Sequence, residues 1–236
     1  MKKKIVNNFQ TKDLFSYMDN IYKKENLPWL LDKKVRKAMN KLINKASKIT
    51  NLEQSELLSQ IDFKPNDLTI EALEGLLAIL RAILWLEDFN FTNIEPIKKI
   101  DIKQTPDFSA FYKPNIKCAV EVFCLTNKYE QQKDSCLDVY VNADPEFDGS
   151  KFYKDFIAKA HSKKKQLDSV ESVEKKILLC VVNPTPLVNL NDISDWNKHA
   201  QFLYEKLKWG NNYHIGFLTG ALINGKLCDV IYPKLS

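Results

Sequence analysis

The stretch TPDFSAFYKPNIKCAVEVFCLTN, residues 105–127, constrains the fold more than any other part of this chain. Its apolar residues alternate on both sides of Lys113–Asn115, a Pro-Asn sequence typical of a hairpin turn. Asn115 suits the left-handed conformation that such loops often need, and a loop of three or five residues keeps the turn centred on Pro114. The resulting cross-strand pairs are Phe111 with Lys117, Ser109 with Ala119, and Asp107 with Glu121. The pattern therefore predicts an antiparallel hairpin that places two carboxylates opposite each other.

Two carboxylates in these positions require a compensating cation. Directly opposed residues have Cβ atoms ~5 Å apart, and two bare carboxylates at that separation repel by roughly 3 kcal/mol at an effective dielectric near 20. Oxygen ligands of this kind suit Mg²⁺, so Asp107 and Glu121 are candidate metal ligands. The alternative is that Asp107 caps a turn after Pro106 while Glu121 points to solvent from an edge strand. The apolar neighbours Val120 and Val122 favour a buried strand, and with it a site.

The arrangement of PDF and VEVF, with residues 108–120 between the two acids, resembles the PD-(D/E)XK nuclease superfamily, the restriction-endonuclease-like fold. There the aspartate follows a proline at a strand start, and the next strand carries Glu-x-Lys. The resemblance covers about residues 66–183 and implies an αβββαβ core with a mixed sheet. It also implies Mg²⁺, with Mn²⁺ as a substitute, bound by Asp107, Glu121 and the backbone carbonyl of Val122.

Phe123 departs from the superfamily pattern, because it stands where a lysine is usual and points the same way as Glu121. Some members of the superfamily carry this lysine on the following helix, predicted here over residues 150–168. On that helix Lys163 projects close to the apolar face and Lys159 lies at its edge, whereas Lys164 and Lys165 point further away. Lys163 is therefore the expected catalytic lysine, with Lys159 second. The alternatives are that Lys163 reaches solvent past the helix end, or that the site has lost catalysis.

Several other acids and His161 are weaker candidates for site residues. The superfamily often carries an acid on the first core helix, where Glu74 fits and Glu71 and Glu87 remain open. The segment DPEFD, residues 144–148, could approach a metal but is expected to be a solvated loop. His161 is expected on the surface.

A row of lysines marks a helix predicted over residues 30–49. The members, which fall within one narrow stripe beside its apolar face, are Lys34, Lys37, Lys41, Lys45 and Lys48. One interpretation is a solvated face; the other is a ridge that binds a nucleic-acid backbone, in keeping with the net charge of +5. A membrane-surface helix is disfavoured, because the apolar side has no Trp or Phe.

Hydrophobic periodicity predicts an α/β chain with two parts. Residues 1–65 are expected to form a helical N-terminal extension, and residues 66–236 a nuclease-like α/β domain. Pro65 marks the boundary, and Asn66 or Asp67 is the expected cap of the next helix. The predicted helices cover residues 14–22, 30–49, 68–87, 150–168 and 194–209, the last capped by Gly210. The predicted strands cover residues 91–98, 107–112, 117–125, 176–183, 214–220 and 226–232, with a possible short one at 137–141.

Five cysteines without CxxC spacing predict reduced, buried thiols in a cytoplasmic protein, and no apolar run is long enough to span a membrane. The expected function is Mg²⁺-dependent phosphodiester hydrolysis, with DNA as substrate, in a restriction, defence or mobile-element setting. A homodimer would be consistent with such a nuclease. The alternatives are an inactive nuclease-fold module that binds nucleic acid or a protein, and a partner-binding protein that works through its N-terminal helices.

Overall fold

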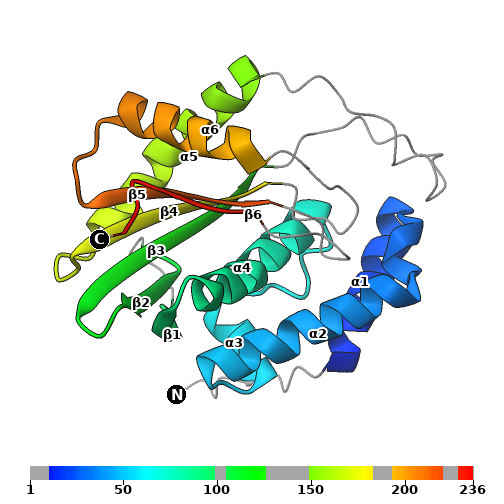
Figure 1. Cartoon of the computed structure of the whole chain (residues 1–236). Coiled ribbons are helices and arrows are strands. Elements are labelled where there is room, and N and C mark those ends of the chain that lie inside the picture. The colour runs from blue at the N-terminus through cyan, green and yellow to red at the C-terminus, as the bar shows by residue number, and fades with distance from the viewer. Residues whose placement is uncertain (1–10, 99–104, 126–148, 183–192, 220–227, 236) are drawn as a thin grey trace, which may run out of the picture.

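The computed structural model describes residues 11–98, 105–125, 149–182, 193–219 and 228–235 (Figure 1). Over these ranges the chain forms six α-helices, one short 3-10 helix and six β-strands. The helices are α1 Thr11–Glu25, η1 Pro28–Leu31, α2 Lys33–Thr50, α3 Gln54–Gln60, α4 Ile70–Asp88, α5 Gly149–Asp168 and α6 Ile193–Leu207. The strands are β1 Phe91–Pro96, β2 Phe108–Tyr112, β3 Ile116–Leu125, β4 Lys175–Val182, β5 Tyr213–Thr219 and β6 Cys228–Tyr232.

The six strands form one mixed sheet in the order β1-β2-β3-β4-β5-β6. Strands β1, β2 and β3 are antiparallel neighbours, β3, β4 and β5 run parallel, and β6 returns antiparallel to β5. The parallel pairs need crossovers, which the helices α5 and α6 supply. The predicted α/β class and the predicted succession of elements from α4 to β6 are therefore present.

Helices cover both faces of the sheet, as Figure 1 shows: α5 and α6 lie on one face, and α4 with α1, α2 and α3 on the other. Strand β3 serves both cores because side chains alternate along a strand. Val120 and Val122 pack on the α4 side, whereas Ala119 and Phe123 pack on the side of α5 and α6. Glu121 lies between the last two in sequence, so its side chain faces α5.

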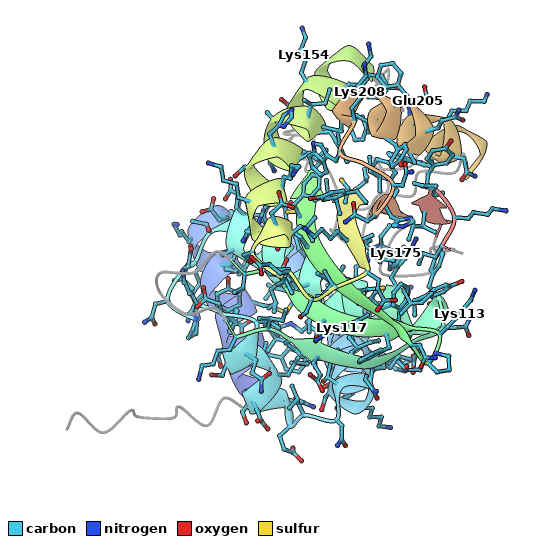
Figure 2. All side chains as sticks on the ribbon, turned by 90° about the vertical axis from the view of Figure 1, so that its left-hand side faces the viewer. Lys113, Lys117, Lys154, Lys175, Glu205 and Lys208 are labelled. Carbon is cyan, nitrogen blue, oxygen red and sulfur yellow. The ribbon has the colours of Figure 1, made fainter. Side chains whose placement is uncertain are left out.

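The N-terminal helices belong to the same hydrophobic cluster as α4 and the first strands. Met18 of α1, Ile43 of α2 and Leu57 of α3 are each fully buried in it together with Leu77 of α4. The labelled Lys154 of α5 and Lys113 of the β2–β3 turn instead project outward (Figure 2). Residues 11–60 thus contribute to a core shared with the α/β part.

The β2–β3 hairpin has the predicted pairs Phe111 with Lys117 and Ser109 with Ala119. The ladder ends at Phe108 with Val120, so the expected pair of Asp107 with Glu121 is not part of it. The turn is the three-residue loop 113–115. The prediction that Asn115 takes the left-handed conformation was wrong. Lys113, with φ 58°, takes it instead.

The structure differs from the prediction at two helix ends and contains one helix that was not predicted. Helix α4 is capped by the side chain of Thr69, which accepts from the N–H of Ala72, while Asp67 accepts from Thr69. Helix α6 ends at Leu207, before the predicted Gly210, because Lys208 already adopts a left-handed φ of 51°. Helix α3 was not predicted; its apolar residues Leu57 and Leu58 are too few to form a periodic pattern.

Three cysteines lie among the described side chains, and all three are free thiols. Cys118 and Cys180 are buried, and Cys124 is half-buried. Cys136 and the side chain of Cys228 lie outside the described part, as does the possible strand at 137–141. Along the described ranges, no helix combines the length and the apolar character that crossing a bilayer demands.

Candidate active site

The site lies where β3 extends beyond the end of its neighbour β2. The last β2–β3 pair joins Phe108 to Val120, yet β3 continues to Leu125. Asp107 lies just before β2 and closes the ladder, because its N–H donates to the Val120 carbonyl at 3.0 Å. The carbonyl of Asp107 accepts from the N–H of Ile97 at 2.8 Å. The backbone of Asp107 is therefore held from both sides at an open edge of β3.

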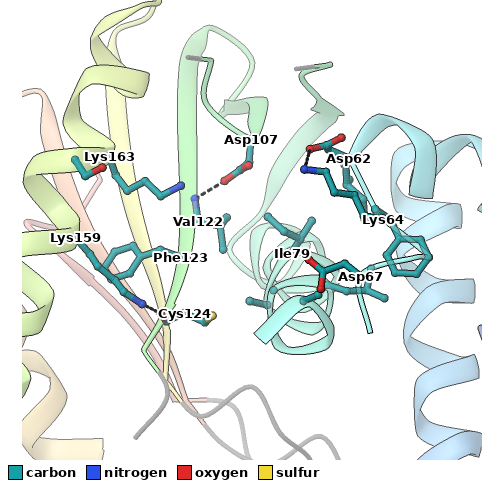
Figure 3. Close-up of a pocket in the computed structure, with 17 residues that line it drawn as sticks. Asp62, Lys64, Asp67, Ile79, Asp107, Val122, Phe123, Cys124, Lys159 and Lys163 are labelled. Carbon is teal, nitrogen blue, oxygen red and sulfur yellow. Dashed lines mark hydrogen bonds and ion pairs between the residues drawn. The ribbon is translucent and has the colours of Figure 1, made fainter. Parts of the chain in front are cut away.

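The carboxylate of Asp107 turns back onto this edge. Its Oδ2 accepts a hydrogen bond of 2.8 Å from the backbone N–H of Val122 (Figure 3), and the residue is buried. Because the N–H and C=O of one strand residue point toward the same neighbour, the Val122 carbonyl lies on the side of Asp107. Two oxygen donors predicted from the sequence thus share one edge of β3.

Glu121 is fully buried and forms an ion pair with Lys163 of α5. The distance from Lys163 Nζ to Glu121 Oε1 is 2.6 Å, and the lysine side chain is 27% exposed. A buried carboxylate is costly unless a cation and hydrogen bonds compensate it. The structure therefore places the ammonium of Lys163 on the glutamate rather than in solvent, and rules out the alternative in which Glu121 points outward.

The neighbouring lysines of α5 occupy different places. Lys159 is exposed, and its ammonium donates to the carbonyl of Cys124 at 2.7 Å, further along the same open edge of β3. Lys164 instead pairs with Asp168 and lies over the ring of Tyr213. Of this run of lysines, Lys163 and Lys159 reach the edge that carries the acids.

Phe123 packs as a core residue. It is 6% exposed, and its ring lies 5.2 Å from that of Phe156 on α5. This contact helps to seat α5 on β3, which is the same docking that brings Lys163 to Glu121. Phe123 therefore supports the helix that brings the ammonium of Lys163 to Glu121.

A cavity of about 450 Å³ opens over this edge, between α4 and α5 (Figure 3). One wall combines Asp107 with residues of β3 and α5: Val122, Phe123, Cys124, Lys159, Ser162 and Lys163. The opposite wall consists of Ile61, Asp62, Phe63, Lys64, Asp67, Ala72, Gly75, Leu76, Ala78 and Ile79. The second wall was not foreseen, because the segment at 61–67 carries no periodic signal and reads as a boundary.

The structure distinguishes the three acids proposed for the first core helix. Glu74 is 8% exposed, whereas Glu71 and Glu87 are exposed. Burial raises the pKa of the Cys124 thiol. The positive charge of Lys159 lowers this pKa, and the negative charge of Glu74 raises it further. Glu74 is thus within electrostatic reach of a residue that lines the cavity.

The remaining predicted residues lie elsewhere. His161 is exposed, as expected, with its ring 6.1 Å from that of Trp209. Residues 144–148 lie outside the described ranges. The five lysines of α2 are all exposed, but they do not line the cavity: Lys34, Lys37, Lys41, Lys45 and Lys48.

Within the residues that the structure describes, no group of three or more His, Cys, Asp and Glu residues could hold a metal ion. Mg²⁺ is commonly bound through one or two carboxylates together with water and substrate phosphates.

Comparisons with protein-family models, with curated proteins and with solved structures found no match to this chain.

Proposed function

We propose that this chain is a Mg²⁺-dependent nuclease, with Mn²⁺ as an alternative ion, that hydrolyses phosphodiester bonds in DNA. One observation carries the proposal: Asp107 is held on the open edge of β3, beside the Glu121–Lys163 pair and in a cavity. The succession α4-β1-β2-β3-α5-β4 supports it, since the restriction-endonuclease-like core has the same order of elements. A restriction, defence or mobile-element role is an analogy from this fold.

The donor set fits a hard divalent cation. Asp107, Glu121 and the Val122 carbonyl would hold Mg²⁺: Asp107 and Val122 line the cavity, and Glu121 precedes Val122 on β3, buried beside Lys163. Glu74 is a further acid near this end of the strand. When bound, the ion would polarise a phosphoryl oxygen and lower the pKa of a bound water.

The residues of the chain would bind and orient the substrate around that ion. The ammonium of Lys163 is positioned to donate to an attacking water or to a phosphoryl oxygen as negative charge develops there. Lys159 holds a second positive charge further along the same strand edge. The ring of Phe123, packed against Phe156, supports the part of α5 that carries these two lysines.

The lysines of α2 would bind the nucleic-acid backbone away from the reacting phosphate. Their exposure leaves all five ammonium groups available for phosphate contacts, which dominate sequence-independent affinity. Lys64 on the rim of the cavity is nearer to the site.

A second candidate is a non-catalytic module of the same fold that binds nucleic acid or a protein partner. Phe123 favours it, because β3 lacks the lysine that usually accompanies the glutamate. The two proposals differ in what Lys163 does: in the module it only neutralises Glu121.

Cleavage assays separate the two. Wild type is incubated with labelled single- and double-stranded DNA and RNA, in Mg²⁺ and in EDTA, beside Asp107→Asn, Lys163→Ala and Lys159→Ala. The nuclease proposal predicts Mg²⁺-dependent products that Asp107→Asn abolishes. Asparagine can still accept from Val122, so this variant should fold. Nucleic-acid binding without products under any metal condition would favour the module.

A further inference from the structure

One wall of the cavity has a chemistry that phosphate binding does not require. Ala72, Gly75, Leu76 and Ile79 of α4 line it, and their spacing of three and four residues places them on one helix face. This apolar face remains partly open, with Gly75 and Ile79 only half-buried. Figure 3 shows Ile79 facing Lys163 across the cavity, with Val122 of β3 between them.

Gly75 leaves unfilled space in this wall. A Cβ added at Gly75 would meet no atom within 4 Å. Glycine weakens a helix interior relative to alanine, so helix stability alone would favour a larger residue here. Phe63 adds an aromatic ring to the adjoining wall, where it packs edge-on against Tyr17 with 5.0 Å between ring centroids.

The size of the cavity suits a small organic group. Its volume of about 450 Å³ falls within the range of roughly 300–1,000 Å³ that is usual for ligand pockets. Cations stand at its margins: Lys159 on α5, and Lys64, which pairs with Asp62 at 3.4 Å, on the opposite wall. An apolar, partly aromatic wall beside cationic groups matches a nucleobase attached to a phosphate backbone.

We propose that the α4 wall receives the base of an unpaired nucleotide next to the reacting phosphate, so that the substrate is single-stranded or locally unpaired. This inference rests on the proposed nuclease function. In a continuous duplex the bases are stacked and paired, and a base reaches such a wall only after leaving the stack. Phosphate contacts from Lys64 and Lys159 would flank the held nucleotide.

The test fills the wall and measures binding without chemistry. Gly75→Leu places a side chain into the cavity and should not lower the thermal midpoint, because leucine is the better helix former. Ala72→Leu fills the same wall from one turn earlier and serves if Gly75→Leu does not fold. Ser59→Leu, on the exposed part of α3 outside the cavity, is the matched control.

Affinity for a fluorescent twelve-nucleotide oligothymidine is measured by anisotropy in EDTA. We expect Gly75→Leu to bind at least ten times more weakly than wild type, and Ser59→Leu to bind like wild type. In Mg²⁺, wild type should cut a duplex with a three-nucleotide unpaired bubble at least ten times faster than the fully paired duplex. Unchanged oligothymidine affinity in Gly75→Leu, or equal rates on the two duplexes, would overturn the inference.

The outcomes also separate this inference from the proposed function. A binding defect in Gly75→Leu, with no cleavage by wild type of any substrate, supports the base site and contradicts the nuclease. If wild type cleaves the substrate and Gly75→Leu changes neither cleavage nor oligothymidine affinity, the nuclease proposal is supported and the base site is contradicted.

Discussion

The ammonium of Lys163 on α5 lies 2.6 Å from the buried carboxylate of Glu121 on β3. Two elements far apart in the sequence thus meet at one ion pair, and the docking of α5 sets its geometry. The contact between Phe123 and Phe156 fixes that docking on the same face of the strand. The lysine therefore reaches the acid from the helix rather than from the strand.

Removing the lysine should destabilise the fold, because it leaves a fully buried carboxylate without its cation. Breaking a buried pair from one side costs about 3–5 kcal/mol, and partial exposure of Lys163 places Lys163→Met at about 2–3 kcal/mol. Lys159→Met, whose ammonium is exposed, should cost less than about 1 kcal/mol. Urea unfolding measures both free energies.

The double variant Glu121→Leu/Lys163→Met serves as the control for this effect. It removes both charges and should recover much of the stability lost in Lys163→Met. Equal destabilisation by Lys163→Met and Lys159→Met would show that the pair is not a buried interaction.

Activity should depend on the two lysines to different degrees. If Lys163 stabilises developing charge, Lys163→Ala should lower kcat by about 10²–10³ with little change in KM. Lys159→Ala should lower activity by about tenfold, because Lys159 would position the substrate. Lys165→Ala, an exposed neighbour, is the control. Full cutting by Lys163→Ala would refute its role while leaving the acids untouched.

The lysines of α2 should account for part of the salt dependence of DNA binding. Each phosphate contact contributes about 0.9 to the slope of log K against log salt. Lys41→Ala/Lys45→Ala should therefore reduce the slope by about 2, measured by anisotropy between low and moderate salt. Lys154→Ala/Lys206→Ala carries the same charge change on α5 and α6. A slope that falls equally in both double variants would show only a general charge effect.

Acid unfolding should report on Asp168 at the end of α5. Burial raises the pKa of its carboxyl, but hydrogen bonds from Lys164, Tyr213 and Lys176 lower it to about 2, below the ordinary value of 3.8. A lowered folded-state pKa gives stability that is present above about pH 4 and lost as the pH falls toward 2. Asp168→Asn should thus flatten the stability profile in that window.

Thermal midpoints between pH 6 and 2 measure this profile. Asp155→Asn, an exposed acid on the same helix, should follow wild type. The account of Asp168 fails if its variant loses stability with acid as steeply as wild type does.

The sequence predicted the features that depend on local pattern. The hairpin register followed from turn symmetry, which pairs Ser109 with Ala119 without knowledge of the rest of the chain. The position of Lys163 followed from the face of one helix, since Phe156 and Ala160 define its buried direction. Both predictions use the period of a single element.

Features that depend on contacts between distant segments could not be predicted. The wall at Phe63 forms because α3 and α4 pack on one core, and no period in that segment records it. Among Glu71, Glu74 and Glu87, burial distinguishes Glu74, and burial is decided by the docking of α4 on the sheet. The caps at Thr69 and Lys208 depended on backbone dihedrals that several neighbouring residues could have adopted.

The central claim is that the edge of β3 holds a divalent cation, and calorimetric titration tests it most directly. Mn²⁺ and Mg²⁺ are titrated into wild type and into Asp107→Asn, with circular dichroism to verify that both are folded. The account predicts saturable binding to wild type that Asp107→Asn abolishes. Absence of binding by either ion, or identical binding to the two proteins, would contradict it.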